Sequence, residues 1–125
     1  MSYEVRIRSN FSAAHALRRY EGPCERRHGH NFAVVAIVAC KNVGDIGIAI
    51  DFKVLRHIID NILDKLDHQD LNEIPPFDNI NPTAENLAAF IYQLASPDVL
   101  ALGATLKSVT VEESDKYAAT YGPEI

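Results

Sequence analysis

Cys24, His28 and His30 are the residues of this chain whose types and spacing point most directly to chemistry. The two histidines flank Gly29 and open an apolar run, Asn31 to Cys40, that is typical of a β-strand. Strand side chains alternate between faces, so we expect both histidines on one face, with Gly29 leaving room on the other. Two imidazoles form a partial metal site. The nearby thiol is either a third ligand or a reactive group beside the metal.

His15 is the other candidate ligand. It ends a strand-like run that begins at Tyr3, and small residues precede it. If the first two strands pair as a hairpin, His15 approaches His28 and His30. Three neutral imidazoles with an open fourth position are the usual ligand set of a catalytic zinc. The pattern therefore favours Zn²⁺ at His15, His28 and His30 over three unrelated strand histidines.

The composition limits the classes of protein that fit. A length of 125 residues suits one domain, spanning 1–125. The net charge of −5 and the pI near 5.4 argue against the basic face that general nucleic-acid binding requires. No apolar run approaches the roughly 20 residues of a membrane span, and no leader peptide is apparent. The two cysteines, Cys24 and Cys40, form no disulfide framework. We therefore expect a cytoplasmic protein with neither nucleic acid nor membrane as a partner.

The hydrophobic periodicity predicts six elements. Strands are expected over 3–17, 28–41 and 106–113, with a short last strand over 117–121. Asp51 and Thr83 suit helix N-caps, because their side-chain oxygens can accept unpaired backbone N–H groups; the second helix is expected to end near Ala95. The segment 67–82 reads as a long loop. This order predicts an α+β fold, an antiparallel four-stranded sheet with two helices on one face and the other face solvated or covered by another subunit.

Two further features remain open on the residues alone. Glu113 shares a strand face with Val109 and Val111. It is therefore either a buried carboxylate that needs a two-donor partner, such as an amidine-like ligand edge, or a solvated residue beyond the strand end. Asp67 directly before His68 can orient the imidazole, but a histidine at a helix C-terminus also interacts favourably with the helix dipole.

Taken together and in order, these segments resemble the 6-pyruvoyl-tetrahydropterin synthase family. The matching segments are Phe11-Ser12-Ala13-Ala14-His15, Cys24-x-x-x-His28-Gly29-His30, Ile50-Asp51-Phe52, Leu66-Asp67-His68-x-x-Leu71-Asn72, Pro82-Thr83-x-Glu85-Asn86 and Val111-x-Glu113. The resemblance runs from about Tyr3 to Tyr121. The short spacing between the thiol and the histidines is similar to that of the bacterial and archaeal branch, 6-carboxy-tetrahydropterin synthase, which serves queuosine and other deazapurine synthesis.

The resemblance implies a tunnelling fold. In that fold the subunits form trimers whose sheets close into a barrel, and two trimers stack into a homohexamer with active sites between subunits. The residue roles that it implies are zinc binding by His15, His28 and His30, a catalytic thiol at Cys24, a proton relay at Asp67 and His68, a pterin anchor at Glu113, and a pterin pocket lined or supported by Thr83 and Glu85.

The implied substrate is 7,8-dihydroneopterin triphosphate, converted to 6-carboxy-tetrahydropterin, acetaldehyde and triphosphate. Zinc would act as a Lewis acid, and Cys24 would take a proton from the substrate side chain. The anionic tail needs local positive charge, for which the candidates are Arg18, Arg19, Arg26 and Arg27. An ordinary solvated loop explains these arginines equally well.

Three alternative functions remain. The closest is formation of 6-pyruvoyl-tetrahydropterin by triphosphate elimination without side-chain cleavage. A second is cleavage of dihydroneopterin toward a folate intermediate, in a branch that tends to replace the cysteine by glutamate. The third is a non-catalytic zinc-binding or pterin-binding oligomer, which has no need for a thiol and a relay.

Overall fold

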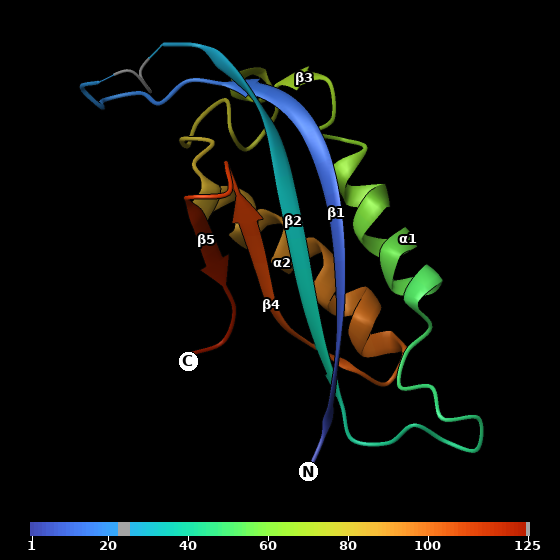
Figure 1. Cartoon of the computed structure of the whole chain (residues 1–125). Coiled ribbons are helices and arrows are strands. Elements are labelled where there is room, and N and C mark those ends of the chain that lie inside the picture. Colours follow the sequence, from blue (N-terminus) through green and yellow to red (C-terminus); the bar gives the residue numbers. More distant parts are fainter. Residues whose placement is uncertain (23–25, 125) are drawn as a thin grey trace.

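The computed structural model describes residues 1–22 and 26–124 (Figure 1). Two long strands come first, β1 (Tyr3–His15) and β2 (His28–Cys40), followed by helix α1 (Phe52–Leu63). The remaining elements are β3 (Gln69–Asp70), a 3₁₀ turn (Leu71–Glu73), α2 (Ala84–Ala101), β4 (Thr105–Glu112) and β5 (Ala118–Tyr121). Both helices lie on the same face of the sheet, so the predicted α+β class with two helices on one face is confirmed.

The sheet differs from the prediction in one strand. Its order is β3-β1-β2-β4-β5, and β3 pairs in parallel with β1 whereas the other neighbours are antiparallel. The sheet is therefore mixed and five-stranded, and the prediction of an antiparallel four-stranded sheet was wrong. β3 has two residues, Gln69 and Asp70, which is too short for an alternating pattern to appear in the sequence.

The strand register follows from the apolar alternation. Phe11 lies opposite Phe32, and the two rings stack with their centroids 4.8 Å apart. Both rings are buried against the helices, and burial of such a side chain contributes roughly 1.5–3 kcal/mol. If one of these strands slipped by one residue, its ring and every side chain in line with that ring would turn to the opposite face.

The helices begin where their N-caps predict. The Asp51 carboxylate accepts from Lys53 N at 2.8 Å, and Thr83 Oγ1 accepts from Asn86 N at 3.1 Å. α2 continues to Ala101, beyond the predicted end near Ala95, and includes Pro97. Proline usually ends a helix, but Val99 in the next turn is fully buried, so tertiary packing carries the helix past it.

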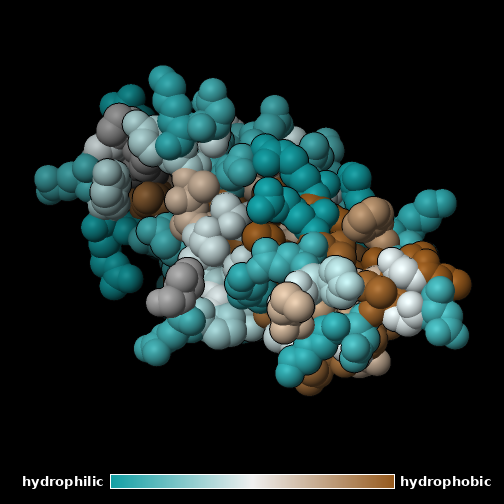
Figure 2. Space-filling view, turned by 60° about the horizontal axis from the view of Figure 1, so that its bottom comes forward, coloured by the Kyte–Doolittle hydropathy of each residue, from teal (hydrophilic) through white to brown (hydrophobic). Residues whose placement is uncertain are grey.

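Apolar side chains also gather at the end of the molecule where the N-terminus, the β2–α1 loop and the end of α2 meet (Figure 2). The large side chains exposed there include Ile46, Ile48, Phe52, Leu100 and Leu102. Among the described residues, no helix combines the length and hydropathy needed to cross a membrane. The histidines lie at the opposite end, where β1 stops and β2 starts.

Candidate metal centre

His15, His28 and His30 come together at one end of the β1–β2 hairpin. The antiparallel register places His15 opposite His28 and Ala13 opposite His30. Because side chains alternate along each strand, the three imidazoles share the face that packs toward the helices. One ring nitrogen from each lies within 4.8 Å of the others. The approach of His15 to the other two histidines, which the sequence predicts, is observed, and the cluster has the donors to hold a metal ion.

Backbone carbonyls orient two of the three rings. His15 Nδ1 donates to the carbonyl of Pro82 at 2.7 Å, and His28 Nδ1 donates to the carbonyl of Arg26 at 2.6 Å. Each bond leaves the lone pair on Nε2, the atom free to bind a metal. Within residues 1–22 and 26–124, His15 Nε2 is a buried nitrogen without a hydrogen-bond partner. An unsatisfied buried nitrogen is costly, and a metal ion would satisfy it.

Burial favours the neutral form of His15, which is the form that binds a metal; this residue is only 1% exposed. Burial lowers its pKa below the usual histidine value, the Pro82 carbonyl raises it, and the positive charge that His28 can carry lowers it further. The net direction is downward, so His15 is neutral at neutral pH. Phe32 packs edge-on against both His15 and His30, with centroids 5.3 and 5.5 Å apart, and closes one side of the cluster to water.

Glu113 lies directly after β4, and its carboxylate faces the cluster. Its Oε1 is 3.9 Å from His15 Nε2, and its side chain is 27% exposed. Glu113 therefore combines the two possibilities left open by the sequence, because the strand has ended and the carboxylate still points to the inner face. Glu85 and Glu113 line a shared hollow of about 190 Å³ beside β5. Thr83 Oγ1 is occupied as the N-cap of α2, so its observed contact is structural.

Asp67 and His68 lie beside the edge of β1 that faces away from β2, just before β3. Asp67 Oδ2 is 3.0 Å from His68 Nδ1, and Asp67 Oδ1 accepts from Ser12 N at 2.9 Å. The Ser12 N–H is the largest cause that lowers the Asp67 pKa; partial burial opposes it and His68 reinforces it. His68 adopts the left-handed conformation, with φ 58°, and 82% of its side chain is exposed. The predicted Asp67–His68 contact is therefore present in the folded chain.

Among residues 1–22 and 26–124, His68 and Glu113 border different hollows. His68 borders a hollow of about 460 Å³ whose lining includes Ser12 and Asn31 and also His30 of the histidine cluster. Glu113 borders the hollow beside β5 instead. In one chain His68 therefore adjoins the histidine cluster through His30, whereas Glu113, the predicted pterin anchor, lines a different hollow.

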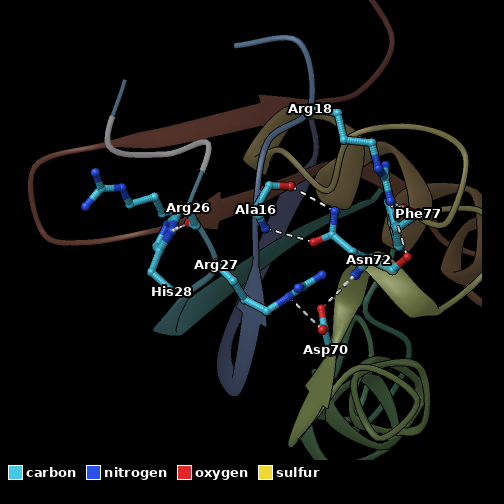
Figure 3. A network of polar contacts seen from close by, with 8 residues as sticks. All are labelled: Ala16, Arg18, Arg26, Arg27, His28, Asp70, Asn72 and Phe77. Carbon is cyan, nitrogen blue, oxygen red and sulfur yellow. Dashed lines mark hydrogen bonds and ion pairs between the residues drawn. The ribbon is translucent and has the colours of Figure 1, made fainter. Parts of the chain in front are cut away.

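The arginines near the site have different surroundings (Figure 3). The Arg18 guanidinium donates to the carbonyls of Ile80, Asn72 and Phe77 at 3.2, 3.2 and 2.8 Å. Arg27 Nε is 2.7 Å from Asp70 Oδ2. The Arg26 side chain is exposed, while its carbonyl accepts from His28. Arg19 is exposed, with φ 59°.

Cys24, the predicted catalytic thiol, lies outside the described residues. The sequence reasoning also missed contributors that act through their backbone or through amides. Pro82 orients His15 through its carbonyl, and Asn72 binds both the N–H and the carbonyl of Ala16, at 2.8 and 2.9 Å. The sequence signals for Pro82 are its position immediately before the N-cap of α2 and its place in the matching segment Pro82-Thr83-x-Glu85-Asn86.

Comparison with known proteins identifies relatives along the whole chain. The family model described as 6-pyruvoyl tetrahydropterin synthase matches residues 4–124. The dihydroneopterin monophosphate aldolase of Pyrococcus furiosus is 37% identical, over 73% of each chain. The 6-carboxy-5,6,7,8-tetrahydropterin synthase of Synechocystis is 39% identical over 66% of this chain and 67% of its own, and that of Bacillus subtilis is 31% identical over 98% and 87%. The solved Caenorhabditis elegans 6-pyruvoyl tetrahydropterin synthase has the same fold, with a TM-score of 0.88 at 24% identity over 99% of this chain and 97% of that one.

Proposed function

The chain belongs to the 6-pyruvoyl tetrahydropterin synthase family, and on that premise we propose that it is a zinc-dependent 6-carboxy-5,6,7,8-tetrahydropterin synthase. It converts 7,8-dihydroneopterin triphosphate and one water molecule to 6-carboxy-tetrahydropterin, acetaldehyde and triphosphate, for queuosine or other deazapurine synthesis. The observation that carries the proposal is the three-histidine cluster, in which the buried Nε2 of His15 has no hydrogen-bond partner among the described residues. Two relatives named for this activity, from Synechocystis and Bacillus subtilis, support it.

The donor set suits zinc. His15, His28 and His30 supply three nitrogens, two of them oriented by carbonyls, and His15 is held neutral by burial. When bound there with one position open, zinc supplies a Lewis acid for the oxygens of the substrate side chain. Thiolate ligands are typical of structural zinc sites, whereas three imidazoles are typical of catalytic ones. With three histidines as the ligands, the Cys24 thiol is not needed to bind the metal and can serve in acid–base catalysis.

The protein residues then divide the remaining tasks. Cys24 takes a proton from the substrate side chain, and His68 gives or accepts one, with its tautomer set by the contact between its Nδ1 and Asp67. Glu113 accepts two hydrogen bonds from the guanidine-like edge of the pterin, formed by the 2-amino group and N3. Its carboxylate is only partly exposed, which strengthens such a charge-assisted pair.

Mass spectrometry of the products tests the proposal. Zinc-loaded protein incubated with 7,8-dihydroneopterin triphosphate is expected to yield 6-carboxy-tetrahydropterin and acetaldehyde. Formation of 6-pyruvoyl-tetrahydropterin would instead indicate the biopterin-type reaction at the same site. Pterin binding without any turnover would indicate a binding protein and contradict the proposed enzyme.

A monophosphate substrate is a second candidate. The Pyrococcus furiosus relative, at 37% identity, is named a dihydroneopterin monophosphate aldolase. Two of the four arginines that the sequence offers for the triphosphate are already engaged, Arg18 by three carbonyls and Arg27 by Asp70. A shorter anionic tail needs fewer cations. Incubation with dihydroneopterin monophosphate would then release a two-carbon phosphate and leave one side-chain carbon on the pterin.

A further inference from the structure

The segment Asp70–Asn72 contacts the chain on both sides of the loop that joins β1 to β2 (Figure 3). On one side, Asn72 binds the N–H and the carbonyl of Ala16, the residue after His15. On the other side, Asp70 pairs with Arg27, the residue before His28, with 2.7 Å between Oδ2 and Nε. Each of these two histidines is thus flanked by a residue that is anchored to the same short segment.

That segment is itself rigidly attached to the fold. Asp70 pairs with Ala14 in the parallel β1–β3 ladder, and its Oδ1 accepts from Asn72 N at 3.2 Å to cap the 3₁₀ turn. Leu71 between them is fully buried. The side chain of Asp70 is 25% exposed, whereas that of Arg27 is 54% exposed, so the carboxylate is the better fixed partner.

The two anchors are not equivalent. The Asn72–Ala16 contact is a pair of neutral amide hydrogen bonds at the end of β1, beside a histidine that is already buried. Arg27 follows Arg26, whose carbonyl accepts from His28 Nδ1 at 2.6 Å. A displacement of the backbone at 26–27 therefore moves the carbonyl that sets both the tautomer and the direction of the His28 ring.

We propose that Asp70 and Arg27 are positioning residues that hold His28 in its metal-binding orientation through the backbone at residues 26–27. The inference rests on the proposed function, because it assumes that the three histidines bind zinc. An exposed ion pair adds little to the free energy of folding. Its expected effect is therefore on metal affinity and geometry, and only weakly on the stability of the metal-free protein.

Zinc and cobalt titrations of the metal-stripped protein test the pair. Asp70→Asn keeps the capping oxygen for Asn72 N and removes the charge. Arg27→Gln removes the other charge at a largely exposed side chain, and Arg27→Lys restores it. The matched control is Arg56→Gln, which removes an arginine from the exposed Arg56–Asp60 pair on α1.

We expect Asp70→Asn and Arg27→Gln each to weaken zinc binding about tenfold in competition with a chromophoric chelator. The double variant should lose no more than either single one, since the two residues act as a unit. The visible spectrum of bound Co²⁺ should change in both single variants. Arg27→Lys and Arg56→Gln should retain wild-type affinity, and the melting temperature of the metal-free protein should stay close to that of the wild type in all variants.

Two outcomes would overturn the inference in distinguishable ways. If the wild-type protein fails to bind one zinc per chain, the proposed function fails and this inference fails with it. If the wild type binds zinc and both Asp70→Asn and Arg27→Gln bind it equally well, only the positioning pair is wrong. Equal weakening in Arg27→Lys and Arg27→Gln would also contradict the role of the charge.

Discussion

At the scale of single residues, two backbone carbonyls decide what the histidines can do. Those of Pro82 and Arg26 accept the Nδ1 protons of His15 and His28 and so leave the lone pair of each ring on Nε2. The residue types alone do not specify a tautomer, because either ring nitrogen of a neutral imidazole can carry the proton. The chemistry of the cluster therefore depends on main-chain atoms as much as on the histidines.

Cys24→Ala separates an enzyme from a binding protein. If Cys24 is the base for the substrate side chain, the variant should lose about 10²–10⁴-fold in kcat. Its zinc stoichiometry should not change, because the three histidines supply the ligands. Steady-state kinetics and metal analysis of the same preparation check both parts. Loss of zinc in the variant would show that the thiol is a ligand instead.

Glu113→Gln tests the pterin anchor. The neutral amide cannot accept two charge-assisted hydrogen bonds, so pterin binding should weaken by about 1.5–3 kcal/mol, or roughly 10- to 100-fold. Calorimetry with a non-reactive pterin measures this directly. Because Glu113 Oε1 lies 3.9 Å from His15 Nε2, zinc content has to be measured in parallel. Retained pterin affinity with lost zinc would assign the carboxylate to the metal.

At the scale of elements, the β1–β2 hairpin and the segment after α1 build the site between them. The register Ala13 with His30 and His15 with His28 places the three rings on one face. His68 N donates to Ser12 O at 2.6 Å, and the Asp67 carboxylate accepts from Ser12 N. The segment after α1 is therefore bound to β1 three residues before His15. Local pairing creates the cluster, and the long-range contact supports it.

The Asp67 contact predicts a pH dependence of stability. The Ser12 N–H and His68 lower the Asp67 pKa below its unfolded value. Its charged form therefore stabilises the folded state above the unfolded value of about 3.9, and this contribution is lost as the pH falls through the lower folded pKa. Asp67→Asn should be less stable than the wild type at neutral pH, with the difference shrinking in acid.

Urea unfolding of the metal-free protein from about pH 2 to pH 7 measures this difference. Asp64→Asn is a suitable control, since Asp64 is an exposed carboxylate at the C-cap of α1, three residues before Asp67. A difference between wild type and Asp67→Asn that persists unchanged in acid would show that the carboxylate charge contributes nothing there.

At the scale of the whole molecule, one chain separates groups that the proposed chemistry needs together. In the described part of the chain, His68 borders a hollow formed by β1 and β2, and Glu113 borders another beside β5. Both helices of the described residues cover the same face of the sheet and leave its other face without one (Figure 1). Apolar side chains including Ile48, Phe52 and Leu102 are exposed at one end of the molecule (Figure 2). We propose that the chain assembles into a homohexamer of two trimers, with sites formed between subunits and a mass six times the 13.9 kDa of one chain.

Mixing two inactive variants tests this arrangement. Cys24→Ala and His68→Ala should each lack activity, but after subunit exchange a site can combine an intact thiol with an intact imidazole from different chains. Random 1:1 mixing should restore about a quarter of the wild-type activity if the two groups come from neighbouring subunits. Light scattering before and after exchange confirms the assembly. No recovery on complete exchange would place both groups in the same chain.

Several features could be predicted because they depend on local patterns. The alternation in β1 and β2, the apolar stripe of α1, and the caps Asp51 and Thr83 all act within a few residues, and all were observed. β3 and the end of α2 could not be predicted in this way. A two-residue strand is too short to show a period of two. α2 continues through Pro97 because Val99, two residues later, is buried by tertiary packing.

The sequence by itself determined that His28 and His30 share a strand face, because the period of two requires it, and it predicted that His15 approaches them if the first two strands form a hairpin. It also determined the proximity of Asp67 to His68, which are neighbours in the chain. Only the tertiary structure decided which ring nitrogen of His15 is free, since the Pro82 carbonyl comes from 67 residues away. It likewise decided that Arg27 pairs with Asp70, that Arg18 binds carbonyls, and that Glu113 faces His15. Each of these contacts joins distant segments, and their meeting depends on how the helices and the sheet pack together.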